Sequence, residues 1–572
     1  MATLSAEEIA NMPLHEFINL PTTVSFYYWY TISFQNYLAE RPYIKLGKVL
    51  KNSVAILYTD ESYMDGILAQ LGYDVINVYP EIYGLTSEAS LEAAGILRVQ
   101  ERPYLNLLGS GVSLIFIDTG IDYTNPTFQY EDGTTRISYI WDQTIDSGEP
   151  TDGVIFGTVY TKEKINEALR SDDPYSIVPH KDEDGHGTFL ASVAAGRRIE
   201  NFIGAAPEAD IIVIKLKGAS QYYRNKFFVP ENQKNAYESI DIMLGLTFGI
   251  ERAELTGNPS VSCIGLGTNF GGHNGQNRLE SYITSLSSNI GIAVCTAVGN
   301  ESNARHHTSG TIEKTGDTAM VEVRAGEMAK DFCVYVWYED LDKISFSLKS
   351  PTGEVINRIP FFVGTRYEKR LIFEKSLVRI FYHQDGNRFA FFQIEDAVPG
   401  IWGITLHGDM IINGRFNAWL PMTGFVSPDV EFVSPVPNYT TVIPSTAIGA
   451  IAVAAYNDIE NSLYINSSWG PALTSKMVPD FAAPGVNIKG YYPYGLSTMT
   501  GTSAAAAITS GAAALVMQWA IVQGNAPATT GNRLRSILIR GCTREDRREY
   551  PNVQWGYGTL NLMGTFNSLR ES

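Results

Sequence analysis

Cysteine is scarce in this chain of 572 residues, which contains only four. They lie far apart and show neither a CxxC pair nor histidine at metal-binding spacing: Cys263, Cys295, Cys333 and Cys542. This spacing argues against a zinc site and against a disulfide framework, so we predict four buried thiols in a protein made in a reducing compartment. We expect no bound metal or cofactor, and the sequence gives no indication for or against calcium.

Positive charge is also in deficit, with 43 Lys and Arg against 61 Asp and Glu and a net charge of −18. Binding to nucleic acid needs a basic stripe, and because none is present we expect no nucleic-acid partner. The N-terminus lacks the basic segment and apolar core of a secretion signal. The most apolar early run, residues 26–34, is too short to cross a membrane. We therefore expect synthesis in the cytoplasm and no membrane span.

Four continuous apolar runs, each ending in small or polar residues, indicate the main fold. They are residues 111–120, 209–218, 260–267 and 291–300. Strands buried on both faces of a parallel sheet show this pattern, whereas half-exposed strands alternate. Helix-like segments lie between the runs, at 187–195 and 234–255. The pattern predicts an α/β fold in which helices flank a parallel sheet.

The pattern changes between residues 310 and 435. This segment has short aromatic or alternating runs, separated by Gly, Pro, Asn and Asp, without helix-like stretches. It predicts an inserted all-β domain, a jelly-roll-like sandwich, whose two ends lie close together. Near the N-terminus, residues 53–79 predict a strand, a helix from Asp60 to Gly72 and a second strand. The expected domains are an N-terminal α+β domain, the two parts of an α/β domain, and the insertion: 1–86, 87–310, 439–572 and 311–438.

Reactive residues stand at the ends of these predicted elements. In an open parallel sheet the active site lies beyond the carboxyl ends of the strands. Asp118 ends the first apolar run and Asn300 ends the last. His186 heads a helix-like segment, and Ser503 begins a long apolar helix that reaches about Val522. The N–H groups and dipole at such a helix start favour a developing anion, so the layout suits acyl transfer.

These motifs closely resemble those of the subtilisin family of serine proteases. The chain order Asp, His, Ser is the subtilisin order, and six segments match in sequence order: DTGID, HGT, GAAPEADIIVIK, AVGNES, AAPGVNI and GTSAAAA. The resemblance implies a Ser503 nucleophile, a His186 general base and an Asp118 that orients the imidazole. The Asn300 side chain, together with the Ser503 N–H, is implied to bind the oxyanion.

The resemblance also implies two strands that pair with a peptide substrate. The substrate would add between segments 215–218 and 265–267 as a further strand, held by backbone hydrogen bonds. The residues implied are Lys215, Leu216, Gly218, Gly265, Leu266 and Gly267. The alternative is that these glycines are ordinary sheet residues. Glu301 either lies at the rim of the pocket for the P1 residue, where it would favour a basic side chain, or is a solvated surface carboxylate.

Three features depart from the usual family pattern. Ala504 and Ala507 stand where the family has Met and Pro in its GTSMAAP motif, so we expect altered packing with preserved chemistry. The β-rich insertion separates Asn300 from Ser503, and no secretion signal is recognised. Together with the long N-terminal extension, this architecture resembles the clostridial Csp germination proteases and their commensal relatives. Some members of that group have lost triad residues and act as pseudoproteases, but this chain keeps all three.

The resemblance implies a serine endopeptidase that cleaves its own propeptide, residues 1–86, and keeps it bound. In subtilisin the catalytic Asp stands about 32 residues into the mature chain. Counting back from Asp118 places the cut between Thr86 and Ser87, with Tyr83 as the P4 residue. The segment around the cut is small and uncharged, as a strand-pairing substrate should be. The alternative is that this segment is a simple linker.

The expected partners are a protein or peptide substrate and the chain's own propeptide. We expect a monomer that is associated with spores or released by a non-classical route. Two other functions stay open at this point. The chain could be a non-catalytic sensor or scaffold on the same fold, or the aromatic residues of the β-domain could make it a carbohydrate- or surface-binding module.

Overall fold

The structure, a computed structural model, describes residues 4–14, 17, 20, 22–49, 54–71, 88–102, 104–145, 154, 156–219, 221–361, 366–385 and 387–570. The chain divides into two compact units, Met1–Leu85 and Thr86–Ser572. Each unit has a hydrophobic core of its own.

The smaller unit contains a three-stranded antiparallel sheet of order β1-β3-β2. Its elements are α1 (Ala6–Asn11), β1 (Thr23–Trp29), α3 (Ile32–Ala39), β2 (Lys45–Val49), β3 (Val54–Asp60) and α4 (Glu61–Leu71). The predicted strand and helix after residue 53 are confirmed as β3 and α4. The helix begins after Asp60 because this carboxylate accepts a hydrogen bond from the Ser62 N–H at 3.1 Å. The second predicted strand, up to residue 79, lies outside the described residues.

The larger unit is built around a nine-stranded, mostly parallel sheet. Its main path runs β22-β21-β9-β8-β4-β7-β5-β6, and β23 pairs with β21. The strands are β4 (Ser113–Asp118), β5 (Ile137–Asp142), β6 (Thr158–Thr161), β7 (Asp210–Lys215), β8 (Ser260–Ile264), β9 (Ile292–Ala297), β21 (Ile451–Asn457), β22 (Ser462–Leu463) and β23 (Phe481–Pro484). The four apolar runs are confirmed as β4, β7, β8 and β9, which are neighbours and pair in parallel.

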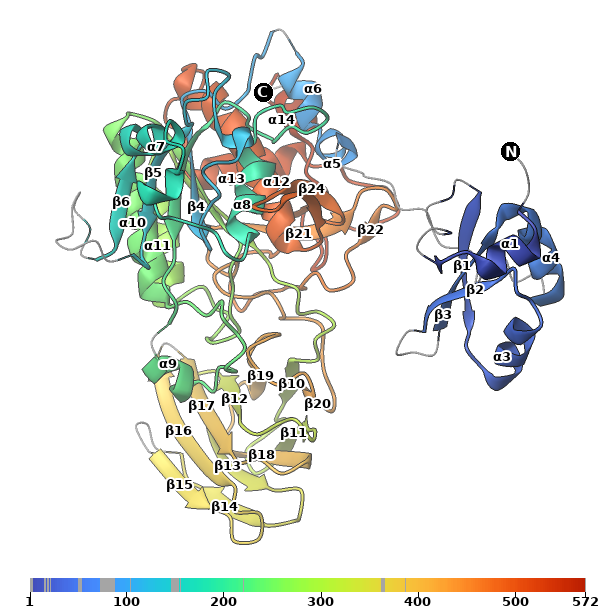
Figure 1. The fold of residues 1–572 in the computed structure, drawn as a ribbon. Helices are drawn as coiled ribbons and strands as arrows, with labels where there is room; N and C mark the ends of the chain where they lie inside the picture. The colour runs from blue at the N-terminus through green and yellow to red at the C-terminus, as the bar shows by residue number, and fades with distance from the viewer. Residues whose placement is uncertain are drawn as a thin grey trace. The chain divides into compact units, whose positions relative to one another are not determined.

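Successive side chains of β4 enter two different cores. Leu114 and Phe116 belong to the core that includes α8 (His186–Ala195) and α12 (Thr502–Met517). Ile115 and Ile117 belong to the core that includes α10 (Ser239–Leu255) and α11 (Arg278–Leu286). Figure 1 shows these two pairs of helices on opposite sides of the sheet. Because both faces are covered, β4 carries apolar side chains on both faces between its polar end residues, Ser113 and Asp118.

The α/β part has several further elements. They are α5 (Glu88–Ala93), α6 (Ile96–Gln100), α7 (Lys162–Leu169), α9 (Gln221–Lys226), α13 (Gly531–Gly541), α14 (Leu562–Arg570), the short helices η2 (Pro126–Phe128) and η3 (Pro174–Ser176), and a hairpin of β24 (Ile488–Tyr492) and β25 (Gly495–Met499). The prediction of a helix from residue 234 is wrong at its start, because α10 begins at Ser239. The Ala236 carbonyl instead accepts a hydrogen bond from Ala219 N at 2.7 Å, which keeps this segment extended.

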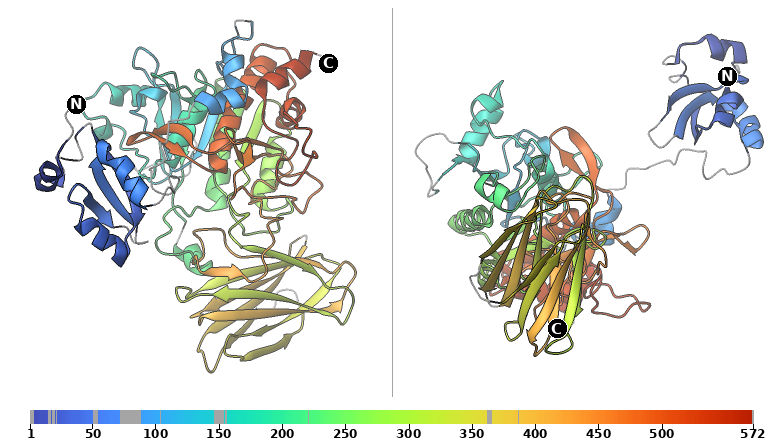
Figure 2. Two further views of the ribbon diagram at one scale, coloured as in Figure 1. Left: turned by 90° about the vertical axis from the view of Figure 1, so that its right-hand side faces the viewer. Right: turned by 90° about the horizontal axis from the view of Figure 1, so that it is seen from below.

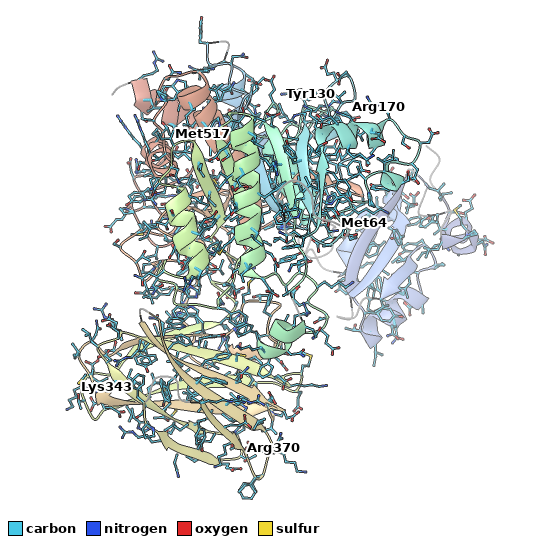
Figure 3. The ribbon with its side chains drawn as sticks, turned by 90° about the vertical axis from the view of Figure 1, so that its left-hand side faces the viewer. Met64, Tyr130, Arg170, Lys343, Arg370 and Met517 are labelled. Atoms are coloured by element: carbon cyan, nitrogen blue, oxygen red, sulfur yellow. The ribbon has the colours of Figure 1, made fainter. Side chains whose placement is uncertain are left out.

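The long apolar helix is confirmed as α12, continued by the π-helical turn η4 (Gln518–Val522). Among the described residues, Thr502–Val522 is the one helical stretch long and apolar enough to cross a membrane. Of its apolar window, 83% is buried inside the protein, which is the environment of a central core helix. Met517, near its end, is labelled in Figure 3. The four cysteines are free and buried, as predicted.

The segment between β10 and β20 forms two antiparallel sheets, β10-β19-β12-β17-β16-β15 and β14-β13-β18-β11-β20. Their strands are β10 (His307–Thr311), β11 (Thr318–Ala325), β12 (Phe332–Tyr338), β13 (Lys343–Lys349), β14 (Val355–Ile359), β15 (Arg366–Arg370), β16 (Leu377–Asp385), β17 (Asn387–Glu395), β18 (Gly400–Met410), β19 (Arg415–Trp419) and β20 (Val430–Phe432). The sheets share one core, with Val336 and Phe392 from the first and Phe346 and Ile404 from the second. Figure 2 shows these strands gathered apart from the helix-flanked sheet.

This β-rich segment is anchored to the α/β part at its ends and across one face. Val436 N donates to the His307 carbonyl at 2.8 Å, so the departing and returning chain lie side by side, as expected. The outer face of the six-stranded sheet presents Tyr335 and Trp337, which share a small aromatic core with Phe227 and Phe270 of the α/β part. The segment therefore packs against the chain that carries it.

Candidate active site

Asp118 and His186 meet as a hydrogen-bonded pair. Asp118 is the last residue of β4 and is buried, with 1% of its surface exposed. Its Oδ1 lies 2.7 Å from His186 Nδ1 and also accepts a hydrogen bond from Thr119 N at 2.8 Å. Burial disfavours the charged imidazole, but the Asp118 carboxylate outweighs it and raises the pKa of His186. The ring is thus oriented and its protonated form is stabilised.

His186 is the first residue of α8, and the start of this helix is fixed by a buried carboxylate. Asp182 Oδ1 accepts from Gly185 N at 2.8 Å, and its Oδ2 accepts from the Thr188 N–H at 2.9 Å and the Thr188 hydroxyl at 2.6 Å. Gly187 sits so close to the chain after Asp118 that a Cβ atom there would overlap the Gly120 carbonyl oxygen. Sequence reasoning missed Asp182, which lies three residues before the N-cap residue Gly185 and so gives no ordinary capping signal.

Ser503 lies in the first turn of α12, beside the end of β8. Its hydroxyl donates to the Gly265 carbonyl at 3.0 Å. A Cβ atom at Gly265 would lie 3.0 Å from His186 Cε1 and 3.3 Å from Ser503 Cβ, so both reactive side chains border this glycine. No hydrogen bond joins Ser503 to His186, both of which are described. A serine hydroxyl rotates freely, and catalytic hydrogen bonds often form only once substrate binds.

Asn300 is exposed and faces the start of α12. Its Oδ1 accepts hydrogen bonds from the Thr502 N–H and the Thr502 hydroxyl, both at 3.2 Å. The Thr502 hydroxyl oxygen in turn accepts from Gly299 N at 3.1 Å. With Oδ1 held in this way, the Nδ2 group is left to donate elsewhere. Sequence reasoning missed these bonds of Thr502 to the Asn300 side chain, although Thr502 lies within the GTS motif.

The two predicted substrate strands lie at different places in the site. Gly265 and Leu266 directly follow β8 at Ser503, and Gly267 packs against Val442, whose side chain a Cβ atom would overlap. Segment 265–267 is therefore at the reactive residues.

Segment 215–218 runs beside Asp118 instead of Ser503. Leu216 N donates to the Asp118 carbonyl at 2.9 Å, and the Leu216 side chain is buried. The Lys215 ammonium bonds the Lys181 carbonyl and Glu183 Oε2, both at 2.6 Å, so its side chain supports the loop before His186. Gly218 is exposed, with open space around its Cα.

Residues 234–237, which sequence reasoning assigned to a helix, form a further edge of the site. Asn235 Nδ2 donates to Asp184 Oδ2 at 2.7 Å, and Tyr237 OH donates to Asn235 Oδ1 at 3.1 Å. Burial and the carboxylates of Asp118, Asp184 and Asp182 raise the pKa of Tyr237. This segment therefore lies near Asp118 and next to the loop that carries His186.

The alternative of a solvated surface carboxylate at Glu301 is wrong. Its side chain is buried, with 2% of its surface exposed. Oε2 lies 2.9 Å from His306 Nδ1, and Oε1 accepts from Thr423 N at 3.1 Å. The carboxylate is thus not solvated, because it is buried and pairs with a histidine five residues later in the chain, and its place at the rim of the pocket for the P1 residue stays a prediction.

The other predicted positions are placed as follows. Ala504 and Ala507 are fully buried within an unbroken α12. Tyr83, Thr86 and Ser87 lie outside the described residues. Among the residues that the structure describes, no group of three or more His, Cys, Asp and Glu side chains is arranged to hold a metal ion.

Comparisons with known proteins identify similar chains. The model of the subtilase family matches residues 109–326 and 431–558. The structure of the Clostridium perfringens CspB protease is similar, with 32% identity and a TM-score of 0.75, covering 84% of this chain and 99% of that chain. A cold-adapted subtilisin-like serine proteinase shows 15% identity and a TM-score of 0.39, covering 82% and 97% of the two chains. The self-cleaved protease domain of PatA shows 14% and 0.39, covering 82% and 99%. A search of curated proteins finds no match.

Proposed function

The chain belongs to the subtilase family and is a subtilisin-like serine endopeptidase, and from this premise we propose that Asp118, His186 and Ser503 form its catalytic triad. Ser503 Oγ attacks the scissile carbonyl of a peptide and forms an acyl-enzyme. His186 takes the hydroxyl proton and returns it to the leaving amine, and water then releases the acyl group. Asp118 holds the imidazole tautomer and stabilises its charged form.

The oxyanion of the tetrahedral intermediate is bound by Asn300 Nδ2 and the Ser503 N–H in this proposal. The Asn300 side chain is held by Thr502 through its oxygen, which leaves its amide group as the donor. The N-terminus of α12 adds a favourable dipole. The observation that carries the whole proposal is the Asp118–His186 pair, at 2.7 Å, together with the place of His186 and Ser503 beside the same glycine, Gly265.

Labelling with a serine-directed reagent tests this assignment. Wild type should react covalently with phenylmethanesulfonyl fluoride at Ser503 and lose peptidase activity, as read by intact mass and peptide mapping. Ser503→Ala should neither label nor hydrolyse peptides, with an unchanged circular dichroism spectrum. Full activity in pure Ser503→Ala would refute the serine mechanism. Labelling of another serine would move the nucleophile elsewhere.

We propose further that residues 1–86 are a propeptide that the enzyme cuts between Thr86 and Ser87. The compact unit that ends at Leu85 supports this, because a separate core suits a segment that is released. Mass spectrometry of wild type beside Ser503→Ala tests it. Wild type should give a large fragment that starts between Leu85 and Leu91, and Ser503→Ala should stay whole. A fully active enzyme with an intact N-terminus would refute self-processing.

We propose that residues 311–438 are a jelly-roll-like domain with a structural role, inserted between catalytic parts 87–310 and 439–572. The aromatic rings on its outer face, Tyr335 and Trp337, are each only 7% exposed. Rings that are already packed against Phe227 and Phe270 favour a structural role over glycan binding.

The biological setting is part of the same proposal. The Csp-like architecture supports a monomeric protease that is associated with spores or released by a non-classical route, and that acts with no cofactor beyond water. Immunodetection in spore fractions and culture medium, with sedimentation of the purified protein, tests these points. Detection confined to vegetative cytoplasm, or a stable dimer, would contradict them.

A further inference from the structure

A second Asp–His pair lies fully buried behind the site. Asp142 is the last residue of β5, and His180 lies in the stretch between η3 and α8. Both side chains are completely inaccessible, and Asp142 Oδ2 is 2.6 Å from His180 Nδ1. Asp142 Oδ1 is also held, by the Thr144 N–H at 2.9 Å and the Thr144 hydroxyl at 2.6 Å. A buried polar pair of this kind is expensive unless every member is satisfied.

The partners of His180 determine which nitrogen carries its proton. Its Nε2 accepts a hydrogen bond from Ile121 N at 3.2 Å, so the proton resides on Nδ1 and is donated to Asp142. Burial alone would raise the pKa of Asp142, but the hydrogen bonds and charge of His180 and the bonds from Thr144 lower it. Asp142 therefore stays a carboxylate and keeps the imidazole in the tautomer that leaves Nε2 free to accept.

The imidazole of His180 also supports the loop after Asp118 by direct packing. Gly120 has φ +118°, and a Cβ atom there would lie 3.0 Å from His180 Cε1 and 3.2 Å from its Nε2. The ring thus lies against Gly120 on one side and bonds Ile121 next to it. Only a glycine can adopt this backbone and accept the ring so closely.

The loop that His180 supports is itself bonded to the start of α8. Thr119 Oγ1 accepts from Gly187 N at 2.9 Å, and Asp122 N donates to Thr188 Oγ1 at 2.9 Å. Residues 119–122 thus connect Asp118 to the helix that begins at His186. A shift of this loop would move the Asp118 carboxylate relative to the imidazole that it orients.

We propose that Asp142 and His180 are positioning residues that pin the loop 119–121 and thereby set the Asp118–His186 geometry. This rests on the proposed triad. The pair touches no substrate and acts only through the loop. A misplacement of about 1 Å in a catalytic group can cost about 10²-fold in rate. Loss of the hydrogen bond from Ile121 N to His180 should therefore reduce turnover without weakening substrate binding.

Two substitutions at His180 separate its two hydrogen bonds. His180→Gln places an amide oxygen near the position of Nε2 and can still accept from Ile121 N, whereas His180→Asn reaches only Asp142. We expect kcat to fall about 10- to 100-fold in His180→Asn with KM within about twofold, and to stay within about threefold of wild type in His180→Gln. The second-order rate of labelling by phenylmethanesulfonyl fluoride should follow kcat. Equal kcat in both variants and wild type would overturn the proposal, as would equal losses in both.

Asp142→Asn tests the tautomer independently. Thr144 donates twice to the Oδ1 position, so the amide oxygen should stay there and the amide N–H group should face His180 Nδ1. The imidazole must then carry its proton on Nε2, which can no longer accept from Ile121 N. We expect a loss of kcat similar to that of His180→Asn, and unchanged kcat would overturn the proposal. Tautomer reversal by an Asp to Asn change is a known route to large rate losses in serine proteases.

His307 supplies a matched control. It is also buried, with Nε2 3.1 Å from Asn417 Oδ1 and Nδ1 3.0 Å from the Val436 carbonyl, but it lies on β10. His307→Gln and His307→Asn should lower thermal stability and leave kcat unchanged. If they reduce kcat as His180→Asn does, the effect is general destabilisation and the proposal is wrong.

Hydrogen exchange in a Ser503→Ala background tests whether His180 holds the loop 119–121, independently of catalysis. Peptides that cover Thr119–Ile121 should exchange at least about tenfold faster with His180→Asn than with His180→Gln or with the background alone. Equal exchange would overturn the proposal even if the enzyme is active. Wild type that neither hydrolyses peptides nor labels at Ser503 would instead refute the proposed triad, and the exchange result would still decide whether His180 holds the loop.

Discussion

Replacing Asp118 by Asn should remove a charge and leave the geometry of the site nearly intact. Asp118 Oδ1 already accepts from both His186 Nδ1 and Thr119 N. Oδ2 is buried and has no hydrogen-bond partner among the described residues. The amide oxygen of the new side chain would therefore take the place of Oδ1, with its amide nitrogen in the place of Oδ2. The imidazole keeps its orientation and tautomer in this variant, but it loses the adjacent negative charge.

The size of the effect follows from the charge separation. With Asp118 Oδ1 and His186 Nδ1 2.7 Å apart, the centres of the two charged groups are about 4 Å apart. At an effective dielectric constant of about 20, two unit charges at this distance attract by about 4 kcal/mol. Since about 1.4 kcal/mol corresponds to a tenfold rate change, kcat should fall by up to about 10³-fold.

The pH dependence of the rate should also change in Asp118→Asn, in a direction that the structure predicts. His186 must be neutral to act as a base, so the rate rises as pH increases through its pKa. Burial lowers this pKa, but Asp118, with smaller contributions from Asp184 and Asp182, holds it above the ordinary 6.5. The acid limb of kcat/KM should therefore lie above pH 6.5 in wild type. In Asp118→Asn, burial still lowers the pKa of His186, but the Asp118 charge that raises this pKa is gone. The acid limb of kcat/KM should therefore move to lower pH.

Measurement of kcat/KM on a chromogenic peptide from about pH 5 to about pH 9 tests both parts together. Glu431→Gln, which alters a surface carboxylate paired with Arg305 and Arg324 in the β-rich segment, is a suitable control and should leave the profile unchanged. Wild-type kcat in Asp118→Asn, or an acid limb at the same pH in both proteins, would refute the role given to Asp118.

Asn300→Ala should lower kcat by about 10²–10³-fold and leave a measurable residual rate in steady-state assays, because the nucleophile and base remain. Thr502→Val should cause a smaller fall in the same assay, since Asn300 loses one anchoring hydroxyl and keeps the backbone N–H; an equal or larger fall would show that Thr502 does more than orient the amide. Gly187→Ala should lower the melting temperature and abolish labelling at Ser503, because the new methyl group would overlap the Gly120 carbonyl; a normal melting temperature would show that the contact relaxes easily. Replacing 315–435 with a short linker should reduce resistance to heat and to added protease, and equal resistance would refute a stabilising role for the insertion.

The sequence was sufficient to predict the elements that follow local patterns. Continuous apolar runs identified β4, β7, β8 and β9, because burial on both faces of the sheet favours apolar residues at successive positions. The ends of these strands and the starts of the helices then placed Asp118, Asn300, His186 and Ser503, because the short motifs around these residues are enough to identify them.

Contacts between distant segments could not be predicted in the same way. The helix expected from residue 234 was displaced because Ala219, well before it in the chain, bonds the Ala236 carbonyl. A solvated position was one alternative for Glu301, yet its side chain is buried because His306 and Thr423 satisfy it. In each case a tertiary partner overrides the local tendency of the residue, and nothing in the neighbouring sequence names that partner.

The long insertion is compatible with the proposed oxyanion site because the hydrogen bonds that hold the residues around Asn300 cross the insertion point. Gly299 N bonds Thr502, and Glu301 N donates to Ser468 Oγ at 2.9 Å, so residues on both sides of Asn300 are fixed by chain that follows the β-rich segment. Val442 N also donates to the Val298 carbonyl at 2.8 Å. The entropic cost of closing a loop grows only slowly with its length. A folded domain with adjacent ends can therefore occupy this position while the proposed oxyanion donor stays in register with the nucleophile.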